Sequence, residues 1–273
     1  MTHSGADIAQ LLSAHGLRPS RALGQNFVAD PNTVRRIARL AGLGPGDPVL
    51  EIGAGLGSLT LALAETGARV VAVETDRHVV PVLRSVVEPA GVEVVEGDAL
   101  ALDLAALLAA HGDGAWSLVA NLPYNVATPL VMRTLTEVPA VTRLLVMVQR
   151  EVGERMAAAV GDDGYGSVSV RVAYFASAEV VGRVPASVFI PRPRVESVLV
   201  RLVRLPEPAV DPTVVSYERL DAVVRAGFGQ RRKMLRRSLA GVVEPDAFAR
   251  AGVRPEARAE ELDIAAWGRL AAS

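Results

Sequence analysis

Apolar and polar positions along the chain follow two different periods, and their order predicts a layered α/β fold. Between Val49 and about Gln149, short runs rich in β-branched residues alternate with stretches of helical spacing. This alternation is typical of a parallel sheet covered by helices on both faces. We predict strands at Val49–Ile52, Arg69–Val73, Val92–Glu96, Ser117–Asn121 and Arg143–Val148. We predict helices at Ser58–Glu65, Asp76–Val87, Leu102–Ala109 and Pro129–Glu137.

The pattern changes beyond this region. Two further strands, Ala178–Val184 and Glu196–Leu205, are predicted at the sheet edge, whereas the spacing of Ser167–Phe175 fits a helix or a strand. Prolines interrupt the chain between Pro206 and Pro212, and helical spacing follows through Ala271. The predicted domains are an N-terminal extension with one helix (residues 1–25), a doubly wound α/β domain (residues 26–207) and a smaller helical domain (residues 208–273).

Composition restricts the classes of partner. The net charge of -1, from 29 basic and 30 acidic residues, gives no overall attraction to nucleic acid, so RNA would be bound by local clusters of Lys and Arg. The absence of Cys excludes thiolate metal sites, and the four scattered His residues predict no metal. The apolar stretch Ala99–Ala110 is interrupted by Asp103 and is too short to span a bilayer, so we expect a cytoplasmic protein without membrane contact.

A glycine-rich turn follows the first predicted strand. Its sequence from Glu51 is EIGAGLGSLT, with a G-x-G-x-G spacing. Ser58 stands where the dinucleotide-binding fingerprint requires its third glycine, which weakens an NAD assignment. Such a turn is by itself also consistent with a plain strand-to-helix connection. We expect the Glu51 carboxylate to hold the amides of this loop.

Acidic residues at the next two strand ends favour a nucleotide cofactor. Glu74 stands 21 residues after Gly53 (74 − 53 = 21), where a carboxylate accepts hydrogen bonds from ribose hydroxyls. Asp98 follows the third strand and could accept a hydrogen bond from the adenine amine of the same cofactor. Three successive strand ends thus carry candidate cofactor ligands.

The fourth strand ends in Asn121-Leu122-Pro123-Tyr124. An exocyclic adenine amine is a poor nucleophile because its lone pair is delocalised, so the Asn121 side-chain oxygen and the Leu122 carbonyl would draw its hydrogens out of the ring plane. Pro123 would stiffen the turn, and Tyr124 would stack on an extruded base. Phe189 is a candidate for the other face of the base. These residues predict methyl transfer to adenine N6 through orientation and electrostatics.

Basic residues gather in two places. The first cluster, at residues 231–237, has no acid among residues 228–239, and helical geometry would place Arg232 with Arg236 and Lys233 with Arg237 in two stripes. The second surrounds the prolines after Phe189. A solvated helix face is the alternative explanation for the first cluster. The candidate RNA-binding residues are Arg192, Arg194, Arg231, Arg232, Lys233, Arg236 and Arg237.

These motifs resemble those of the ribosomal RNA adenine dimethyltransferases, and among them the bacterial branch that acts on 16S ribosomal RNA. The resemblance spans almost the whole chain and comprises five motifs in order. They are LGQNF at 23–27, EIGAGLGSLT at 51–60 with Glu74 and Gly97-Asp98, NLPY at 121–124, FIPRPRVES at 189–197 and FGQRRK at 228–233. The loop at 161–166 departs from the family because it carries Asp162 and Asp163 where a basic residue is usual.

The resemblance implies a Rossmann-like class I methyltransferase sheet that uses S-adenosylmethionine and no metal. It implies that Asn26 and the backbone of Val28 close over this cofactor, beside Gly53, Glu74, Asp98 and Asn121. The implied activity is N6-dimethylation of two adjacent adenosines in 16S rRNA of the 30S subunit or its precursor, by a monomer that serves subunit biogenesis. The alternatives are a macrolide-resistance-type 23S rRNA dimethylase, a small-molecule methyltransferase and a non-catalytic ribosome-assembly factor.

Overall fold

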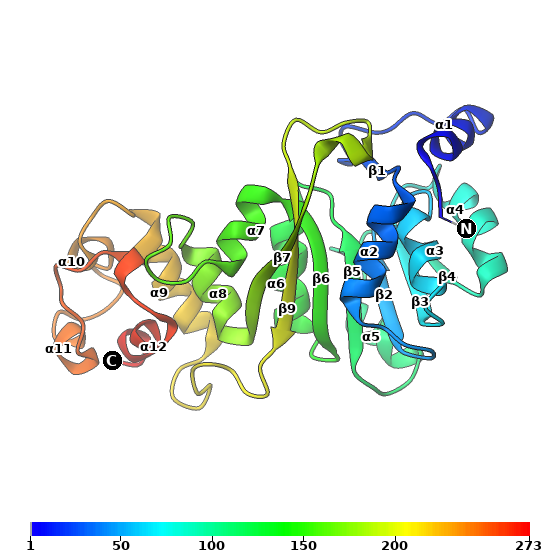
Figure 1. The fold of residues 1–273 in the computed structure, drawn as a ribbon. Coiled ribbons are helices and arrows are strands. Elements are labelled where there is room, and N and C mark those ends of the chain that lie inside the picture. Colours follow the sequence, from blue (N-terminus) through cyan, green and yellow to red (C-terminus); the bar gives the residue numbers. More distant parts are fainter. Residues whose placement is uncertain (1) are drawn as a thin grey trace. The chain divides into compact units, whose positions relative to one another are not determined.

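The central sheet of the computed structural model has seven strands in the order β4-β3-β2-β5-β6-β9-β7. The structure describes residues 2–273. Four pairings, β2 with β3, β2 with β5, β3 with β4 and β5 with β6, are parallel, whereas β9 runs antiparallel to β6. The strands are β2 (Pro48–Ile52), β3 (Arg69–Glu74), β4 (Glu93–Glu96), β5 (Trp116–Asn121), β6 (Val141–Gln149), β7 (Ala176–Val184) and β9 (Ser197–Arg204). The predicted parallel sheet and its two edge strands are confirmed (Figure 1).

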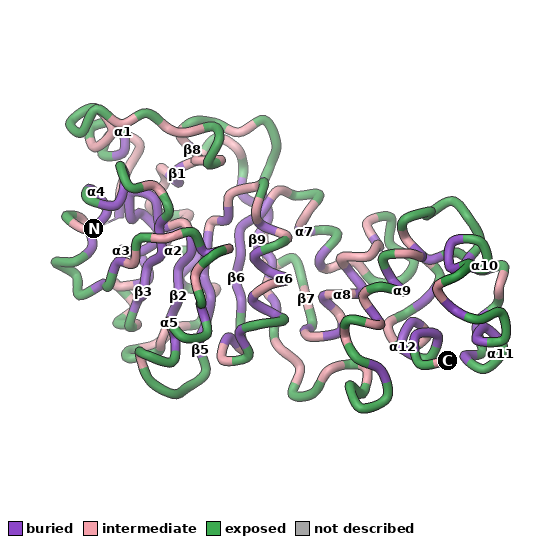
Figure 2. The backbone as a smooth tube through the Cα atoms, turned by 180° about the vertical axis from the view of Figure 1, so that it is seen from behind, coloured by how far each residue is buried: buried purple, intermediate pink, exposed green. Residues whose placement is uncertain are grey.

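Both faces of this sheet are covered. Neighbouring residues on a strand point to opposite faces, yet Val49 and Leu50 on β2 are both 0% exposed. Such runs occur where helices pack on both sides, and Figure 2 shows the central strands buried along their length. The helices of this layer are α2 (Pro31–Ala41), α3 (Ser58–Ala64), α4 (Val80–Val87) followed by η1 (Glu88–Ala90), α5 (Leu104–Ala110) and α6 (Ala127–Glu137). The predicted doubly wound α/β class is confirmed.

The sheet grows in two directions from its middle. From β2 the chain proceeds to β3 and β4 on one side, then crosses to β5 and β6 on the other. Open α/β sheets bind ligands at the carboxyl ends of the strands where this reversal occurs. The glycine loop follows β2 and Leu122 follows β5. The topology therefore brings the two principal sequence motifs to one edge of the sheet.

The N-terminal part supplies a segment that crosses this edge. Helix α1 (Gly5–Ala14) begins in a capping box of Ser4 and Asp7. Strand β1 (Phe27–Val28) then pairs antiparallel with β8 (Phe189–Ile190), which follows η2 (Ala186–Val188). Helix α2 is not among the predicted helices, although Asp30 accepts hydrogen bonds from the amides of the first turn and Pro31 opens the helix, both of which are start signals.

By its internal contacts the chain forms two compact units. One comprises the residues up to Gly153 with Val180–Val203, and the other comprises Glu154–Glu179 with Arg204–Ser273. The helices from residue 150 onward are α7 (Arg150–Ala157), α8 (Ser167–Phe175), α9 (Tyr217–Gly229), α10 (Leu235–Ser238), α11 (Ala247–Ala251), η3 (Ala259–Glu261) and α12 (Ile264–Ala272). Within residues 2–273, none of the helices combines the length and apolarity that a membrane crossing requires.

The second unit has its own core. Trp267 is 0% exposed and packs in one cluster with Tyr165 and Tyr174. Helical structure after residue 208 is confirmed, and Ser167–Phe175, which fitted two structures by its spacing, is a helix. The domain boundary predicted at residue 208 assigns residues 154–179 to the α/β domain. By their contacts these residues belong to the second unit, because Tyr165 and Tyr174 bury their rings in the helical cluster.

Candidate active site

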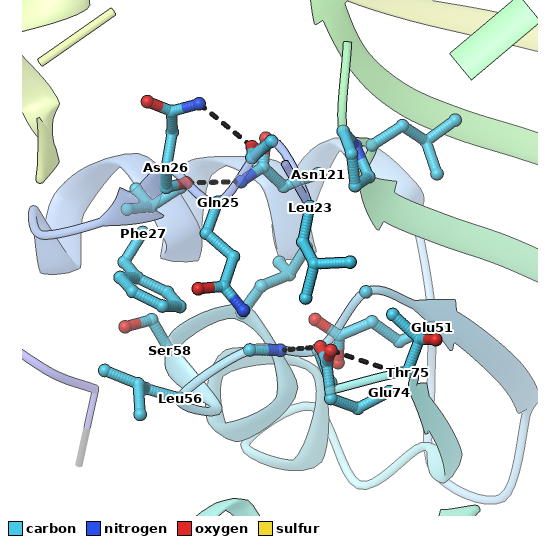
Figure 3. Close-up of a pocket in the computed structure, with 18 of the residues that line it drawn as sticks. Leu23, Gln25, Asn26, Phe27, Glu51, Leu56, Ser58, Glu74, Thr75 and Asn121 are labelled. Atoms are coloured by element: carbon cyan, nitrogen blue, oxygen red, sulfur yellow. Dashed lines mark hydrogen bonds between the residues drawn. The ribbon is translucent and has the colours of Figure 1, made fainter. Parts of the chain in front are cut away.

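One cavity lies at the carboxyl edge of β2 and β5 (Figure 3). The glycine loop, the segment 23–28, Glu74 and the four residues from Asn121 onward all line it. Of the residues predicted to bind cofactor or target base, it brings together Asn26, Val28, Gly53, Glu74, Asn121, Leu122, Pro123 and Tyr124.

The glycine loop has a backbone that other residues adopt only with strain. Gly53, Gly55 and Gly57 have φ values of 75°, 57° and 86°. A Cβ atom at Gly55 would lie 3.0 Å from the Phe27 ring, and one at Gly57 would lie 2.7 Å from Val87 on α4. The third glycine therefore serves close packing of α3 against α4, whereas the first two shape the cavity wall.

Glu74 at the end of β3 fixes this loop. One carboxylate oxygen accepts the Gly55 amide at 2.8 Å, and the other accepts the amides of Thr75 and Asp76, each at 2.9 Å. A carboxylate has about four acceptor positions, so roughly one remains for a ligand hydroxyl. The expectation that Glu51 holds the loop amides is wrong, because the carboxylate that accepts the Gly55 amide belongs to Glu74.

Glu51 lies deeper in the cavity wall. Its side chain is 1% exposed, and its Oε2 atom has no hydrogen-bond partner. Burial raises the pKa of this carboxyl to about 8; the neighbouring Thr60 hydroxyl acts in the opposite direction and the charge of Glu74 adds to the rise. Burial also raises the pKa of Glu74, against the effect of its three amide donors.

The segment before β1 crosses from one side of the cavity to the other. Gln25 donates a hydrogen bond to Asp76 at 2.8 Å, and the Asn26 carbonyl accepts one from the Asn121 side chain at 3.0 Å. Gly24, with φ of 64°, sits against Pro123, where a Cβ atom would approach to 3.2 Å. These contacts hold Asn26 over the edge of the sheet, and its closure over a cofactor stays a prediction.

The last residue of β5 and the residue after it present two unused acceptors. Because the Asn121 NH2 group donates to Asn26, its Oδ1 atom faces away and accepts no hydrogen bond within residues 2–273. The Leu122 amide donates to the Met147 carbonyl at 3.1 Å, and no donor in the described chain uses the Leu122 carbonyl. Tyr124 is anchored by its hydroxyl, which lies 2.8 Å from Ser197 Oγ, and burial raises the pKa of this phenol.

Two predicted residues do not line the cavity. Phe189 is 3% exposed and packs in the hydrophobic cluster that includes Val28 and Val34. Asp98 is exposed after β4, and its carboxylate accepts the Leu100 amide at 2.9 Å. Their roles toward a base and a cofactor stay predictions. Across the described chain, His, Asp and Glu side chains form no group of three that could hold a metal ion.

The basic cluster at residues 231–237 is exposed, but its predicted helical stripes are wrong. Helix α9 ends at Gly229, and α10 contains four residues, so Arg232 and Lys233 do not lie on a helix with Arg236 and Arg237. The amides of Leu235 and Arg236 donate instead to the carbonyls of Ala257 and Pro255. Burial of Leu235, which is 0% exposed, fixes this turn.

Some basic residues of the cluster at 231–237 form ion pairs with glutamates, and others do not. Arg231 pairs with Glu260 at 2.9 Å, and Arg236 pairs with Glu256 at 3.2 Å. The side chains of Arg232, Lys233 and Arg237 have no partner within residues 2–273. Arg192 and Arg194 are likewise exposed, on the connection between β8 and β9.

Several residues that build the site are not among those predicted from the sequence. Gln25 and Asp76 hold the crossing segment, and Ser197 anchors Tyr124. Ser197 closes the FIPRPRVES motif and is 0% exposed, so its place in that motif was the available signal. The acidic loop at residues 161–166 is a solvated turn. The Asp162 carboxylate accepts a hydrogen bond from the Ala159 amide, and the Asp163 carbonyl accepts one from the Arg231 side chain.

Solved structures define the class of the fold. The chain resembles the crystal structure of 23S rRNA methyltransferase ErmE with a TM-score of 0.69 and 28% identity, over 90% of this chain and 98% of that one. It resembles a dimethyladenosine transferase from Plasmodium falciparum with a TM-score of 0.73 and 25% identity, over 88% and 94% of the two chains. The fold is that of an RNA methyltransferase with a Rossmann-like sheet.

Sequence comparison then defines the family. Residues 17–273 match the ribosomal RNA adenine dimethylase family, and the chain belongs to it. A protein of Kineococcus radiotolerans named ribosomal RNA small subunit methyltransferase A is 44% identical, over 98% of this chain and 90% of its own length. A protein of the same name from Phenylobacterium zucineum is 46% identical, over 97% and 91%. The predicted family is confirmed.

Proposed function

We propose that the protein transfers methyl groups from S-adenosylmethionine to N6 of two adjacent adenosines in the 16S rRNA of the small ribosomal subunit or its precursor. The observation that carries this proposal is the pair of free acceptors, Asn121 Oδ1 and the Leu122 carbonyl, beside the glycine loop. Two acceptors match the two hydrogens of an exocyclic amine. The proposed setting is the cytoplasm, with a monomer acting in subunit biogenesis.

The cavity suits the cofactor. Gly53 and Gly55 leave its wall without side chains, and the partnerless Glu51 Oε2 offers an acceptor to a cationic ligand. The acceptor position left on Glu74 would bind a ribose hydroxyl, Asp98 would bind the adenine amine, and Asn26 and Val28 would close the site. When bound, S-adenosylmethionine supplies an electrophilic methyl group attached to a sulfonium.

The chain's own groups would then orient the target. The Asn121 side-chain oxygen and the Leu122 carbonyl would accept hydrogen bonds from the two amine hydrogens, which would turn the nitrogen lone pair out of conjugation with the ring. Tyr124 would stack on the base. Fixed acceptors would stabilise the positive charge that develops on N6, and N6 would lose its extra proton to solvent after transfer, so no strong base is required. Phe189 would need to leave its buried cluster to cover the second face.

RNA would be held by exposed basic side chains. Phosphate contacts by Arg192, Arg194 and the cluster at 231–237 would supply affinity, and the cavity would supply chemical selectivity. The helical unit is thereby proposed to bind the ribosomal substrate.

A 23S rRNA substrate is the second candidate, because ErmE has a similar fold. The full-length relatives at 44–46% identity carry the small-subunit name, which favours 16S rRNA over the 28% identical ErmE. The deciding experiment incubates the protein and methyl-labelled cofactor with unmethylated small subunits, large-subunit RNA and no RNA, followed by nucleoside analysis. Dimethyladenosine from small subunits alone supports the proposal, whereas the same product from large-subunit RNA alone contradicts it.

A further inference from the structure

Two buried carboxyl groups line the cavity, and the described lining includes no Lys, Arg or His. Glu51 is 1% exposed and Glu74 is 5% exposed. They reach the cavity from the neighbouring strands β2 and β3 (Figure 3). A cavity with two acids and no base attracts a cation more strongly than a neutral ligand.

Hydrogen bonds distribute the charge of this pair unequally. Glu74 accepts three main-chain amides, which stabilise its ionised form, whereas Oε2 of Glu51 has no partner. Burial raises the pKa of Glu51 to about 8, and the charge of Glu74 adds to that effect. Without ligand, the amide donors therefore favour the negative charge of the pair on Glu74, and the proton on Glu51, whose pKa is about 8.

The other side chains around Glu51 do not change charge near neutral pH. On α3, Ser58 and Thr60 are uncharged hydroxyls, and Tyr124 stays neutral because burial raises the pKa of its phenol.

Two ionisable groups stand at the periphery. Asp76 is occupied by Gln25, and His3 bonds to the Leu56 carbonyl with a pKa that burial lowers. Glu51 is thus the group whose protonation responds to a ligand near neutral pH.

We propose that Glu51 is a specificity-determining counter-charge that distinguishes the substrate cofactor from its product. S-adenosylmethionine carries one more positive charge than S-adenosylhomocysteine, because its sulfur is a sulfonium. Binding of the cationic form drives the Glu51 proton into solvent, and binding of the neutral-sulfur product lets Glu51 keep more of that proton. Loss of the methyl group thereby weakens retention of the spent cofactor. This inference rests on the proposed cofactor.

The test is calorimetric binding of each cofactor to the full chain without RNA, in two buffers of different ionisation enthalpy. At pH 7, S-adenosylmethionine should release more protons than S-adenosylhomocysteine. As pH rises from 6 to 8, the dissociation constant of S-adenosylmethionine should fall by up to about tenfold per pH unit, which is the limit for one linked proton. The dissociation constant of S-adenosylhomocysteine should fall less.

Glu51→Gln copies the shape of the protonated side chain. In this variant the two cofactors should no longer differ in proton release or in the pH dependence of their dissociation constants. Glu137→Gln, at an exposed residue of α6 paired with Arg133, is the matched control and should behave as the parent. Where Glu51→Gln binds too weakly for calorimetry, infrared difference spectra of the parent serve instead, because a protonated carboxyl band should disappear on addition of S-adenosylmethionine.

The outcomes separate the two proposals. Binding of both cofactors with equal proton release and parallel pH dependence overturns the role of Glu51 and leaves the proposed function standing. Binding of neither cofactor overturns the proposed function and the role of Glu51 together.

Discussion

The side chain of Asn121 donates a hydrogen bond to the main-chain carbonyl of Asn26 across 3.0 Å, which joins positions 95 residues apart. A carbonyl can only accept, so this bond fixes the NH2 group of Asn121 toward Asn26 and its oxygen away from it. The segment over the cavity and the proposed amine acceptor are therefore positioned by the same contact.

Replacement of Asn121 by Ala should reduce methyl transfer by about 100-fold or more, the effect of removing one fixed polar group at a reacting centre. Cofactor affinity should fall less, because Gly53 and Glu74 remain. Single-turnover assays and cofactor titrations measure the two effects, and Asn32→Ala on α2 is the control. Unchanged turnover in Asn121→Ala contradicts the proposed role.

Tyr124→Phe and Tyr124→Ala separate the hydroxyl from the ring. The Phe variant loses the bond to Ser197, whose buried hydroxyl would then lack this partner, at a cost of about 1 kcal/mol in unfolding free energy. It should keep most activity, whereas the Ala variant should raise KM for RNA and lower kcat. Equal activity of both variants in steady-state assays would exclude base stacking by Tyr124.

Salt dependence should distinguish the free from the paired basic residues. Changing Arg232, Lys233 and Arg237 together to Ala should weaken RNA binding and reduce the slope of log affinity against log salt by about 2, since each phosphate contact contributes roughly 0.7 to 0.9. Changing Arg231 and Arg236 should have a smaller effect per residue, because both are engaged by glutamates. Filter-binding titrations over a salt series measure these slopes, and a parent-like slope in the triple variant contradicts phosphate contact.

The stability of the cofactor-free protein should fall as pH rises. The pKa of Glu51 is raised to about 8 in the folded protein, so folding favours the protonated carboxyl. The stability that this preference contributes is fully present below the pKa of the unfolded chain and is lost as pH rises toward 8. Between pH 6 and 8 the loss is about 2 kcal/mol. Urea denaturation should show this decline in the parent and its absence in Glu51→Gln; the same decline in both would assign it to another group.

Local sequence was sufficient for most of the sheet and for part of the site. The runs at β2, β3 and β5 are apolar on both faces, and the glycines after β2 permit the positive φ angles of a tight turn, so these elements are visible without any tertiary contact. Asp30-Pro31 is a start signal of the same kind for α2. Residues at strand ends, such as Asn121, could be placed because parallel strands end at one edge.

Two segments differ from their local sequence pattern for a tertiary reason. Ser167–Phe175 has β-branched residues in a nearly alternating pattern, yet it is a helix because Val170 and Tyr174 bury in the helical unit. The stripes expected across residues 232–237 do not exist because Leu235 bonds to Ala257. In both cases long-range packing overrides a local preference.

The sequence by itself determined the order of the elements, the glycine loop and the chemistry available after β5, because hydrophobic period and residue type act over a few positions. The tertiary structure decided that Glu74 rather than Glu51 holds the loop, that Gln25 and Asp76 tie the crossing segment down, and that Ser197 anchors Tyr124. Those pairings join residues 19 to 73 positions apart. A local pattern cannot specify them, because which distant donor reaches which acceptor depends on how the strands are ordered in the folded sheet.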